Sequence, residues 1–473
     1  MRSAVVGALV LLGVAPVPGG RQTASDFAAA ESAIRDLAQK AGIPGAAVAV
    51  VAGDRVVWTA GVGVANVETG APVTPDTLFQ IGSITKTFTA AAVLSAASAG
   101  VVALDRPVST YVTGLAACVG APTLAQLLSH TGGLIDEPDE YGPQGEDGLG
   151  AYPRTWTAEY CLLPPGRAFS YTNSGFALAG LALQEAARTP FAEVMRARVL
   201  APLGLTRTTF RPTEAMTWPL AVGHTRKADG TVEVVRPLAN DPRLWPAGTL
   251  YSSANDMARL VVALMNDGTV AGRQGLPSGV VAAMRTSHAD IPTTGESYGQ
   301  GLFLQATQGG YGHGGTMTGY TAQLSVRGRV GLVVLTNADA AAVDALVERL
   351  WPEVLDAAPV ATHLAGLRSG PPPPPLVPGL PALSARALTE SDAARYTGRF
   401  SNPRRFTVEV AATGAALVLR RFGRDFPMRA LATPGRFLVD LPRGGTETIA
   451  FGLGPDGRAD HLQMNVWALA RVP

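Results

Sequence analysis

The residues with the clearest chemical potential are Ser83 and Lys86, a serine and a lysine three positions apart. This spacing places both side chains on one face of a helix, where a neutral amine can accept the proton of a serine hydroxyl. The lysine is an unusual choice for this chain, in which 35 of the 38 basic residues are arginines. Because a guanidinium stays protonated in proteins, only a lysine can serve as the base. The pair therefore predicts a serine nucleophile activated by an amine.

The structural alternative is that Ser83 caps the helix and Lys86 faces solvent in its first turn. A lysine at a helix N-terminus opposes the helix dipole, which disfavours that alternative. Gly82 also leaves room for another backbone to approach Ser83 closely. We therefore prefer the catalytic interpretation of the pair.

Two further segments carry groups that could assist such a nucleophile. Tyr171 and Asn173 follow a Pro-Pro-Gly turn. The phenol of Tyr171 could transfer a proton, and the amide of Asn173 could donate or accept an orienting hydrogen bond. His313, Gly314 and Gly315 precede an expected hairpin, where glycines let a ligand approach strand backbone. Each segment alone is also typical of an ordinary turn.

Together, the three segments resemble the active-site motifs of the penicillin-recognising serine hydrolases in their order and approximate spacing. The resemblance covers about residues 25 to 360 and is closest to the branch that holds class C β-lactamases, family VIII carboxylesterases, D-Ala-D-Ala carboxypeptidases and D-aminopeptidases. Supporting segments match the same branch as loop and packing signatures, so His130 is interpreted as structural: Leu127 to Leu134, Pro246 to Ser253 and Tyr298 to Gly301.

The resemblance implies a role for each matched residue. Ser83 would be the nucleophile, and Lys86 and Tyr171 would share the general-base and general-acid duties, with the first base left open. Asn173 would position the lysine and the substrate, beside the substrate-binding His313, Gly314 and Gly315. The backbone N–H groups of Ser83 and Thr316 would form the oxyanion hole. No cofactor is implied, and no metal either, because no two histidines have H-x-x-x-H spacing.

His313 is the point at which the chain departs from the β-lactamases, which usually carry Lys-Thr-Gly there. A histidine with a reference pKa of about 6.5 is mostly neutral at pH 7 and would gain charge toward pH 6. An acidic segment would also disfavour anionic substrates if it bordered the cleft, although a solvated loop is an equal alternative; it contains Asp136, Glu137, Asp139, Glu140, Glu146 and Asp147. We therefore expect esters and D-amino-acid peptides to be preferred over β-lactams.

The elements that position these residues follow from hydrophobic periodicity. Helices are expected over Ser25–Gln39, Thr85–Ala99, Ser253–Met265 and Ala341–Leu350, and hairpin strands over 46–51 with 55–60 and 320–326 with 330–336. Strands at both ends of this region, with helices between, predict the α+β class. The expected architecture is an antiparallel sheet flanked by helices plus an all-helical subdomain, as in the β-lactamase/transpeptidase fold.

A proline-rich linker over residues 367–388 separates a catalytic domain, placed at 21–366, from a C-terminal unit at 389–473. That unit is expected to be a small β-meander or barrel-like domain because of its short strand-like runs: Phe406–Val410, Ala416–Arg420, Pro427–Ala430, Phe437–Leu441 and Glu447–Phe451. All three motifs precede the linker, so we expect this domain to be separable and turnover to survive its removal.

Composition limits the partners and the compartment. The 473 residues carry a net charge of +1, so no basic field is available for nucleic acid or an anionic membrane. The apolar run from Ala4 to Val17 predicts a signal peptide over residues 1–20 and export to the periplasm or the medium. It is too short for an integral membrane helix. Cys118 and Cys161 could form a disulfide or remain free thiols.

The leading functional hypothesis is an exported serine hydrolase, of carboxylesterase or D-amino-acid peptidase type, that cleaves a small ester, amide or D-amino-acid peptide through a Ser83 acyl-enzyme. A β-lactamase or penicillin-binding D-Ala-D-Ala carboxypeptidase is the alternative within the enzymes. A catalytically silent protein that binds the cell wall or a partner is the alternative of another class. The presence of Ser83, Lys86 and Tyr171 speaks against silence. The oligomeric state is left open.

Overall fold

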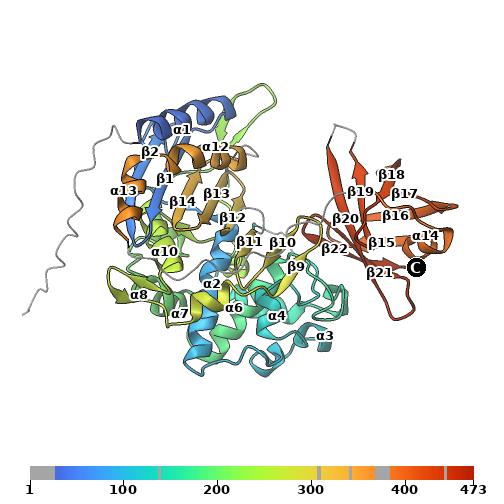
Figure 1. Cartoon of the computed structure of the whole chain (residues 1–473). Coiled ribbons are helices and arrows are strands. Elements are labelled where there is room, and N and C mark those ends of the chain that lie inside the picture. Colours follow the sequence, from blue (N-terminus) through green and yellow to red (C-terminus); the bar gives the residue numbers. More distant parts are fainter. Residues whose placement is uncertain (1–26, 137–139, 306–309, 340–342, 368–383, 442–444) are drawn as a thin grey trace, which may run out of the picture.

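The computed structural model describes residues 27–136, 140–305, 310–339, 343–367, 384–441 and 445–473 (Figure 1). The predicted signal peptide, most of the predicted linker, and Glu137 and Asp139 of the acidic segment lie outside these residues.

An antiparallel sheet of eight strands forms the centre of the first domain, in the order β2-β1-β14-β13-β12-β11-β10-β9. It joins the two ends of that domain, because β1 pairs with β14 and places Ala49 opposite Val333. Both predicted hairpins are confirmed in this sheet. The strands are β1 (Gly45–Ala52), β2 (Arg55–Gly63), β9 (Ala289–Ile291), β10 (Glu296–Tyr298), β11 (Phe303–Gln305), β12 (Gly310–Met317), β13 (Tyr320–Arg327) and β14 (Val330–Thr336).

Helices cover both faces of the sheet, which explains why β1 is apolar throughout. Val48 and Val50 pack in the cluster that holds α1 and α12, whereas Ala49 and Val51 pack in the cluster that holds α2 and α10. Successive side chains of a strand point to opposite faces, so a strand buried on both faces carries no polar alternation. The four helices correspond to the predicted ones: α1 (Ala28–Ala41), α2 (Thr85–Ser98), α10 (Ala254–Met265) and α12 (Val343–Leu355).

The predicted helical subdomain lies between these segments. Its longest helix, α6, is buried from Ser174 to Leu183. A disulfide joins Cys118 to Cys161 across 43 positions and settles the state of the two cysteines. Helix α6 spans Asn173–Ala187, and the other helices between these segments are short: α3 (Ala117–Gly120), α4 (Leu124–Leu128), α5 (Gly148–Ala151), α7 (Phe191–Met195), α8 (Ala201–Leu203), α9 (Pro212–Ala215) and α11 (Val280–Met284). Helix α13 (Ala358–Gly366) follows α12 and packs in the same cluster as α1 and α12. Three pairs of short strands complete the domain: β3 (Phe79–Gln80) with β6 (Tyr251–Ser252), β4 (His224–Arg226) with β5 (Val232–Val234), and β7 (Thr269–Val270) with β8 (Arg273–Gln274).

The C-terminal unit is a closed barrel of eight strands preceded by α14 (Glu390–Tyr396). Its interior is filled by side chains such as Phe400, Phe437 and Leu462, as expected for a barrel of this size. The prediction of a barrel-like unit is confirmed, but the sequence analysis missed three strands. One of them, β21, buries the polar His461 and Gln463, which hides its strand pattern. The strands are β15 (Gly398–Asn402), β16 (Phe406–Thr413), β17 (Ala416–Arg421), β18 (Arg424–Ala430), β19 (Arg436–Asp440), β20 (Thr446–Leu453), β21 (Ala459–Met464) and β22 (Trp467–Val472).

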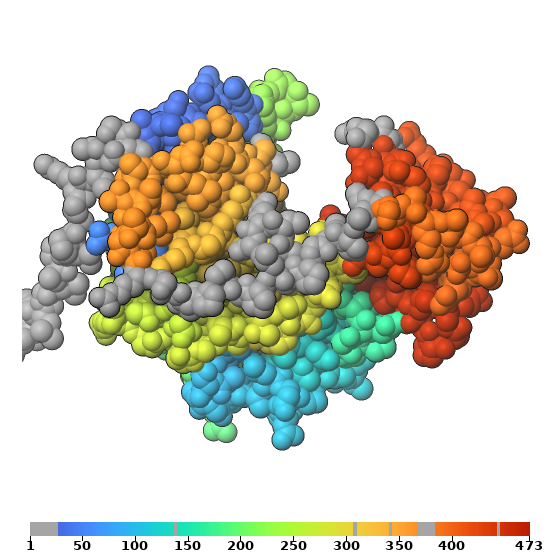
Figure 2. All heavy atoms as spheres, in the orientation of Figure 1, coloured from blue at the N-terminus to red at the C-terminus, as the bar shows by residue number. Residues whose placement is uncertain are grey.

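The barrel touches the first domain along one side, beside the yellow segment that contains β9 and β10 (Figure 2). Arg167 of the first domain forms an ion pair with Asp460 of the barrel and donates a hydrogen bond to the carbonyl of Leu453. These contacts join the two domains on this side. In the part of the chain that the structure describes, no helix is both long and apolar enough to cross a membrane.

Candidate active site

The site begins at a tight turn that carries Ser83 from β3 into α2. Gly82 has a φ of 53°, a conformation that favours glycine. A Cβ on Gly82 would lie 2.3 Å from the backbone nitrogen of Thr316 on β12. The glycine therefore lets the nucleophile turn and the edge of the sheet approach each other, as the sequence analysis expected.

Lys86 lies one helical turn after Ser83 and has no solvent exposure. Its Nζ donates hydrogen bonds to Ser83 Oγ at 2.9 Å, to Asn173 Oδ1 at 2.7 Å and to the carbonyl of Ala247 at 2.7 Å. Burial lowers the pKa of Lys86 to about 7. A large fraction of this amine is therefore neutral at pH 7 and can accept the Ser83 proton.

Tyr171 faces the same pair but has the opposite acid–base character. Its ring centroid lies 4.9 Å from the Nζ of Lys86. Burial raises the pKa of the phenol well above its ordinary value, and a hydrogen bond with Ser83 opposes this only in part. At neutral pH the arrangement therefore offers Lys86 as the proton acceptor and Tyr171 as a proton donor.

The pKa of Lys86 sets an expected pH dependence. Activity should rise with pH as the amine loses its proton, so kcat/KM for a neutral ester should show an acid limb with an apparent pKa near 7. The rates of p-nitrophenyl butyrate hydrolysis from about pH 5 to 9, corrected for spontaneous hydrolysis, measure this limb. A profile that stays flat through neutrality would contradict the assignment of Lys86.

The two backbone groups predicted to form the oxyanion hole lie side by side. Gly315 packs so closely against the nucleophile turn that a Cβ on it would lie 2.0 Å from the carbonyl oxygen of Ile81 and 2.8 Å from the nitrogen of Ser83. The next residue is Thr316, whose nitrogen faces Gly82 as described above. The arrangement can place two N–H donors on one developing oxyanion.

Gly315→Ala should therefore be severely impaired. The added methyl group must push β12 away from the turn, which should lower kcat/KM by about 100-fold, the cost of losing an oxyanion donor. Gly366→Ala is the matched control, because a Cβ there meets no atom within 4 Å. Ester hydrolysis by both variants tests this expectation, and near-normal activity of Gly315→Ala would argue against an oxyanion hole at this position.

His313 lies beneath the cleft and is 3% exposed. Its Nδ1 lies 2.6 Å from the carbonyl of Gly314 and its Nε2 lies 3.0 Å from the Tyr298 hydroxyl. Because a carbonyl only accepts, the proton resides on Nδ1 and Nε2 accepts from the tyrosine. Burial, aided by the charge of Lys86, lowers the pKa of His313 to about 3. The expectation that the imidazole gains charge toward pH 6 is therefore wrong: it stays neutral.

His130 and Asn173 hold the tyrosine segment in place. His130 is fully buried, accepts the N–H of Thr172 at Nδ1 over 3.1 Å and lies 4.2 Å from the Tyr171 ring, between centroids. Asn173 is the first residue of α6, and its N–H donates to Asp136 Oδ1 at 2.7 Å. These contacts are structural in kind, in agreement with the interpretation of His130.

A cleft of about 1030 Å³ opens over the nucleophile. Its lining includes Ser83, Tyr171, His313, Gly314, Gly315 and Thr316, and among the described residues that line it there is no lysine or arginine. Four carboxylates are among its lining residues: Glu296, Asp339, Asp344 and Glu348. The described lining therefore carries negative and no positive side-chain charge.

The barrel supplies a wall of this cleft, which the sequence analysis did not anticipate. The turn between β21 and β22 places Asn465, Val466 and Trp467 on the cleft. The carbonyl of Val466 accepts the N–H of Tyr171 at 2.8 Å, and Ser170 Oγ accepts the N–H of Ala468 at 3.2 Å. These turn residues form no recognisable motif, so only the tertiary structure reveals them. All three motifs precede the linker, yet residues of the barrel also line the cleft.

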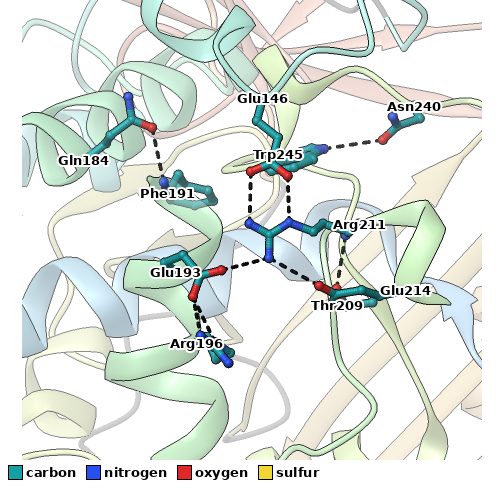
Figure 3. Close-up of polar contacts among 10 residues, drawn as sticks. All are labelled: Glu146, Gln184, Phe191, Glu193, Arg196, Thr209, Arg211, Glu214, Asn240 and Trp245. Atoms are coloured by element: carbon teal, nitrogen blue, oxygen red, sulfur yellow. Dashed lines mark hydrogen bonds and ion pairs between the residues drawn. The ribbon is translucent and has the colours of Figure 1, made fainter. Parts of the chain in front are cut away.

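The acidic segment is tied to the protein at several points. Glu140 accepts from the N–H and the hydroxyl of Thr318 at 2.8 and 2.7 Å. Figure 3 shows Glu146 facing the guanidinium of Arg211, with contacts of 2.6 and 3.0 Å. Arg211 also binds Glu193 at 2.9 Å and Glu214 at 3.3 Å. None of the segment's described residues lines the cleft, so they do not carry the expected repulsion of anions.

Over the described ranges, no group of three histidine, cysteine or acidic side chains is arranged to hold a metal ion.

Comparison with known proteins finds similar sequences and similar solved structures. Penicillin-binding protein 4 of Amycolatopsis lactamdurans is 28% identical over 339 residues, which are 69% of this chain and 87% of that protein. The crystal structure of SurE is 28% identical with a TM-score of 0.73, over 95% of this chain and 99% of that one. A second SurE structure, with D-Leu, is 26% identical with a TM-score of 0.71, over 95% and 100%.

The fold of the first domain is shared more widely. A class C beta-lactamase from Rhodobacter sphaeroides is 24% identical with a TM-score of 0.56, over 72% of this chain and 99% of that one. The family model described as Beta-lactamase matches residues 30–355, which contain Ser83, Lys86, Tyr171 and His313. The protein therefore belongs to the beta-lactamase family of serine hydrolases.

Proposed function

We propose that this protein is an exported hydrolase that forms an acyl-enzyme at Ser83 and prefers neutral or cationic esters and D-amino-acid amides to β-lactams. The observation that supports it best is the buried amine of Lys86 in contact with Ser83 Oγ at 2.9 Å. Around this pair, the described cleft lining offers no cation to a substrate carboxylate.

The reaction follows from the geometry. Lys86 takes the Ser83 proton as Oγ bonds to the substrate carbonyl carbon, and the oxyanion is held by the N–H groups of Ser83 and Thr316. Tyr171 gives its proton to the leaving group as the ester or amide bond breaks, and it is reprotonated from Lys86. Water then attacks the acyl-enzyme and releases the acid and Ser83.

The substrate preference rests on charge. His313 is neutral throughout the working pH range, and Glu296, Asp339, Asp344 and Glu348 line the cleft. Arg327 pairs with Glu348, but Arg327 does not line the cleft, so a carboxylate on the substrate would meet no cation among the described lining residues, whereas an ammonium group would be attracted to the remaining carboxylates. The similarity to a SurE structure with D-Leu supports an acyl group or leaving group of the D-amino-acid type.

Two observations support export. An apolar stretch follows Arg2 near the start of the chain, as in signal peptides. The Cys118–Cys161 disulfide is of a kind that persists in oxidising compartments.

Penicillin acylation is the second candidate, because Penicillin-binding protein 4 is among the relatives. One experiment separates the candidates: intact-mass analysis after treatment with a fluorophosphonate and with a labelled penicillin, followed by kcat/KM for p-nitrophenyl butyrate, D-leucine p-nitroanilide and nitrocefin. We expect fluorophosphonate labelling lost in Ser83→Ala, and turnover of the ester or the anilide ahead of nitrocefin. A preference for nitrocefin would overturn the substrate proposal, and the absence of any covalent adduct would indicate a silent protein.

His313→Lys provides a further check on the substrate proposal. A charge-assisted hydrogen bond to a carboxylate contributes about 1.5–3 kcal/mol, so the ratio of nitrocefin to ester turnover should rise about ten- to hundredfold. An unchanged ratio in a folded variant would remove His313 as a determinant of substrate class.

A further inference from the structure

We propose that Arg405, on the C-terminal barrel, is a positioning residue of the active site: it binds Asp136, which holds Asn173, and it balances a buried negative charge next to the catalytic amine. This inference rests on the proposed function of Ser83 and Lys86. Arg405 acts through other residues and contacts neither of them.

A continuous series of contacts leads from the barrel to the nucleophile. The guanidinium of Arg405 forms an ion pair with Oδ2 of Asp136, whose side chain is 1% exposed. The other oxygen of Asp136 accepts the N–H of Asn173 at 2.7 Å. The side chain of Asn173 in turn accepts from Lys86, and Lys86 donates to Ser83. Asp136 thus fixes the first residue of α6, where a carboxylate also suits the helix dipole.

The barrel holds Arg405 in a defined position. The residue lies in the turn between β15 and β16, where its N–H donates to the carbonyl of Asn402 at 2.9 Å. Its guanidinium carbon lies 4.5 Å from the centroid of the Trp467 ring, and Trp467 lines the cleft. Arg405 and Asp136 are 269 positions apart, so the ion pair forms only when the barrel is docked.

Charge explains why the pair matters for catalysis. The titratable and charged groups of the described residues that interact at this site include Tyr171, Tyr298, His130, His313 and Arg405. Burial keeps both tyrosines protonated and both histidines neutral at pH 7. Lys86 is a second cation that interacts with the charge of Asp136, and without Arg405 this interaction would favour the protonated amine more strongly.

A protonated Lys86 cannot accept the Ser83 proton, so loss of Arg405 should favour the inactive form of the amine. The charge of Asp136 already acts to raise the pKa of Lys86. A buried carboxylate left without its partner is costly, which adds to the tendency of Lys86 to stay charged.

The test compares pH profiles of full-length variants. In Arg405→Gln, the acid limb of kcat/KM for p-nitrophenyl butyrate should move up by about one pH unit, with activity about fivefold lower at pH 7 and recovering in alkali. Arg405→Gln combined with Asp136→Asn should move the limb back toward the natural position, because the buried charge is gone. Arg399→Gln, which removes an exposed arginine on β15, is the matched control and should leave the limb in place.

The outcomes are distinguishable. Loss of activity by the same factor at every pH, with no movement of the limb, would mean a merely structural role and would overturn the proposal. If Arg405→Gln does not fold, Arg405→Lys is used instead, because it keeps the positive charge. The acid limb of Arg405→Lys should stay near its natural pH, and a shift of a full pH unit in this variant would overturn the proposal. Fluorophosphonate labelling of the natural enzyme is measured first: no labelling refutes the proposed function, whereas labelling with an unshifted Arg405→Gln profile refutes only the role of Arg405.

Discussion

Lys86→Arg should be almost as inactive as Ser83→Ala, with kcat/KM lowered about 10⁴-fold or more. The substitution keeps the positive charge and much of the length, but a guanidinium does not release its proton and so cannot accept one from Ser83. The site also has no space for the larger group, since Nζ is fully buried and already contacts three oxygen atoms. Both the chemistry and the geometry therefore require a lysine.

The measurement is ester turnover together with the covalent mass gained from a fluorophosphonate, on variants whose circular dichroism matches the natural protein. Lys227→Arg is the matched control, because Lys227 is half-exposed and pairs with Glu233 at 2.5 Å on the surface. It should retain full activity. Substantial acylation of a folded Lys86→Arg variant would transfer the role of the base to Tyr171, in spite of the raised pKa of that phenol.

The sequence was enough to find Ser83 and Lys86, because these residues differ from the rest of the chain in type or in spacing. Lys86 is one of few lysines in an arginine-rich chain, and its spacing from Ser83 has a direct chemical meaning. The central sheet and its long helices were also predictable, since their hydrophobic periods are local properties of the sequence. Which distant segments lie together in space was predicted only from the order of the motifs and elements along the chain.

The remaining features depend on tertiary burial and docking, which a local pattern does not encode. His313 seemed able to gain charge near pH 6, yet its enclosure against Tyr298 keeps it neutral. Asp136 belongs to the acidic segment, for which the sequence allows either a border of the cleft or a solvated loop, whereas its side chain is buried and paired with Arg405. Val466 and Trp467 lie in an unremarkable turn of the barrel, and their importance follows from where the barrel docks.

Removal of the barrel by truncation after Gly366 should therefore leave a folded but poorly active protein. Tyr171 would lose the backbone acceptor at Val466, and the cleft would lose the wall formed by Trp467. A misplacement of about 1 Å in a catalytic group costs about 100-fold. The lost apolar contact with substrate adds roughly another tenfold, and the loss of Arg405 disfavours the neutral form of Lys86, so kcat/KM at neutral pH should fall about 10³-fold or more. This result would be the opposite of the survival of turnover expected from the sequence.

The full-length variant Trp467→Ala separates the loss of the wall from the loss of the whole barrel. It removes the ring over which Arg405 lies but keeps the backbone contact from Val466 to Tyr171, so its kcat/KM should fall only about tenfold. Circular dichroism and melting temperature show whether the truncated chain is folded before its rates are compared. Natural turnover by a folded truncated chain would mean that Tyr171 keeps its position without the Val466 carbonyl and that Lys86 works without Arg405. The first domain would then be catalytically complete without the barrel, as the position of all three motifs before the linker predicts.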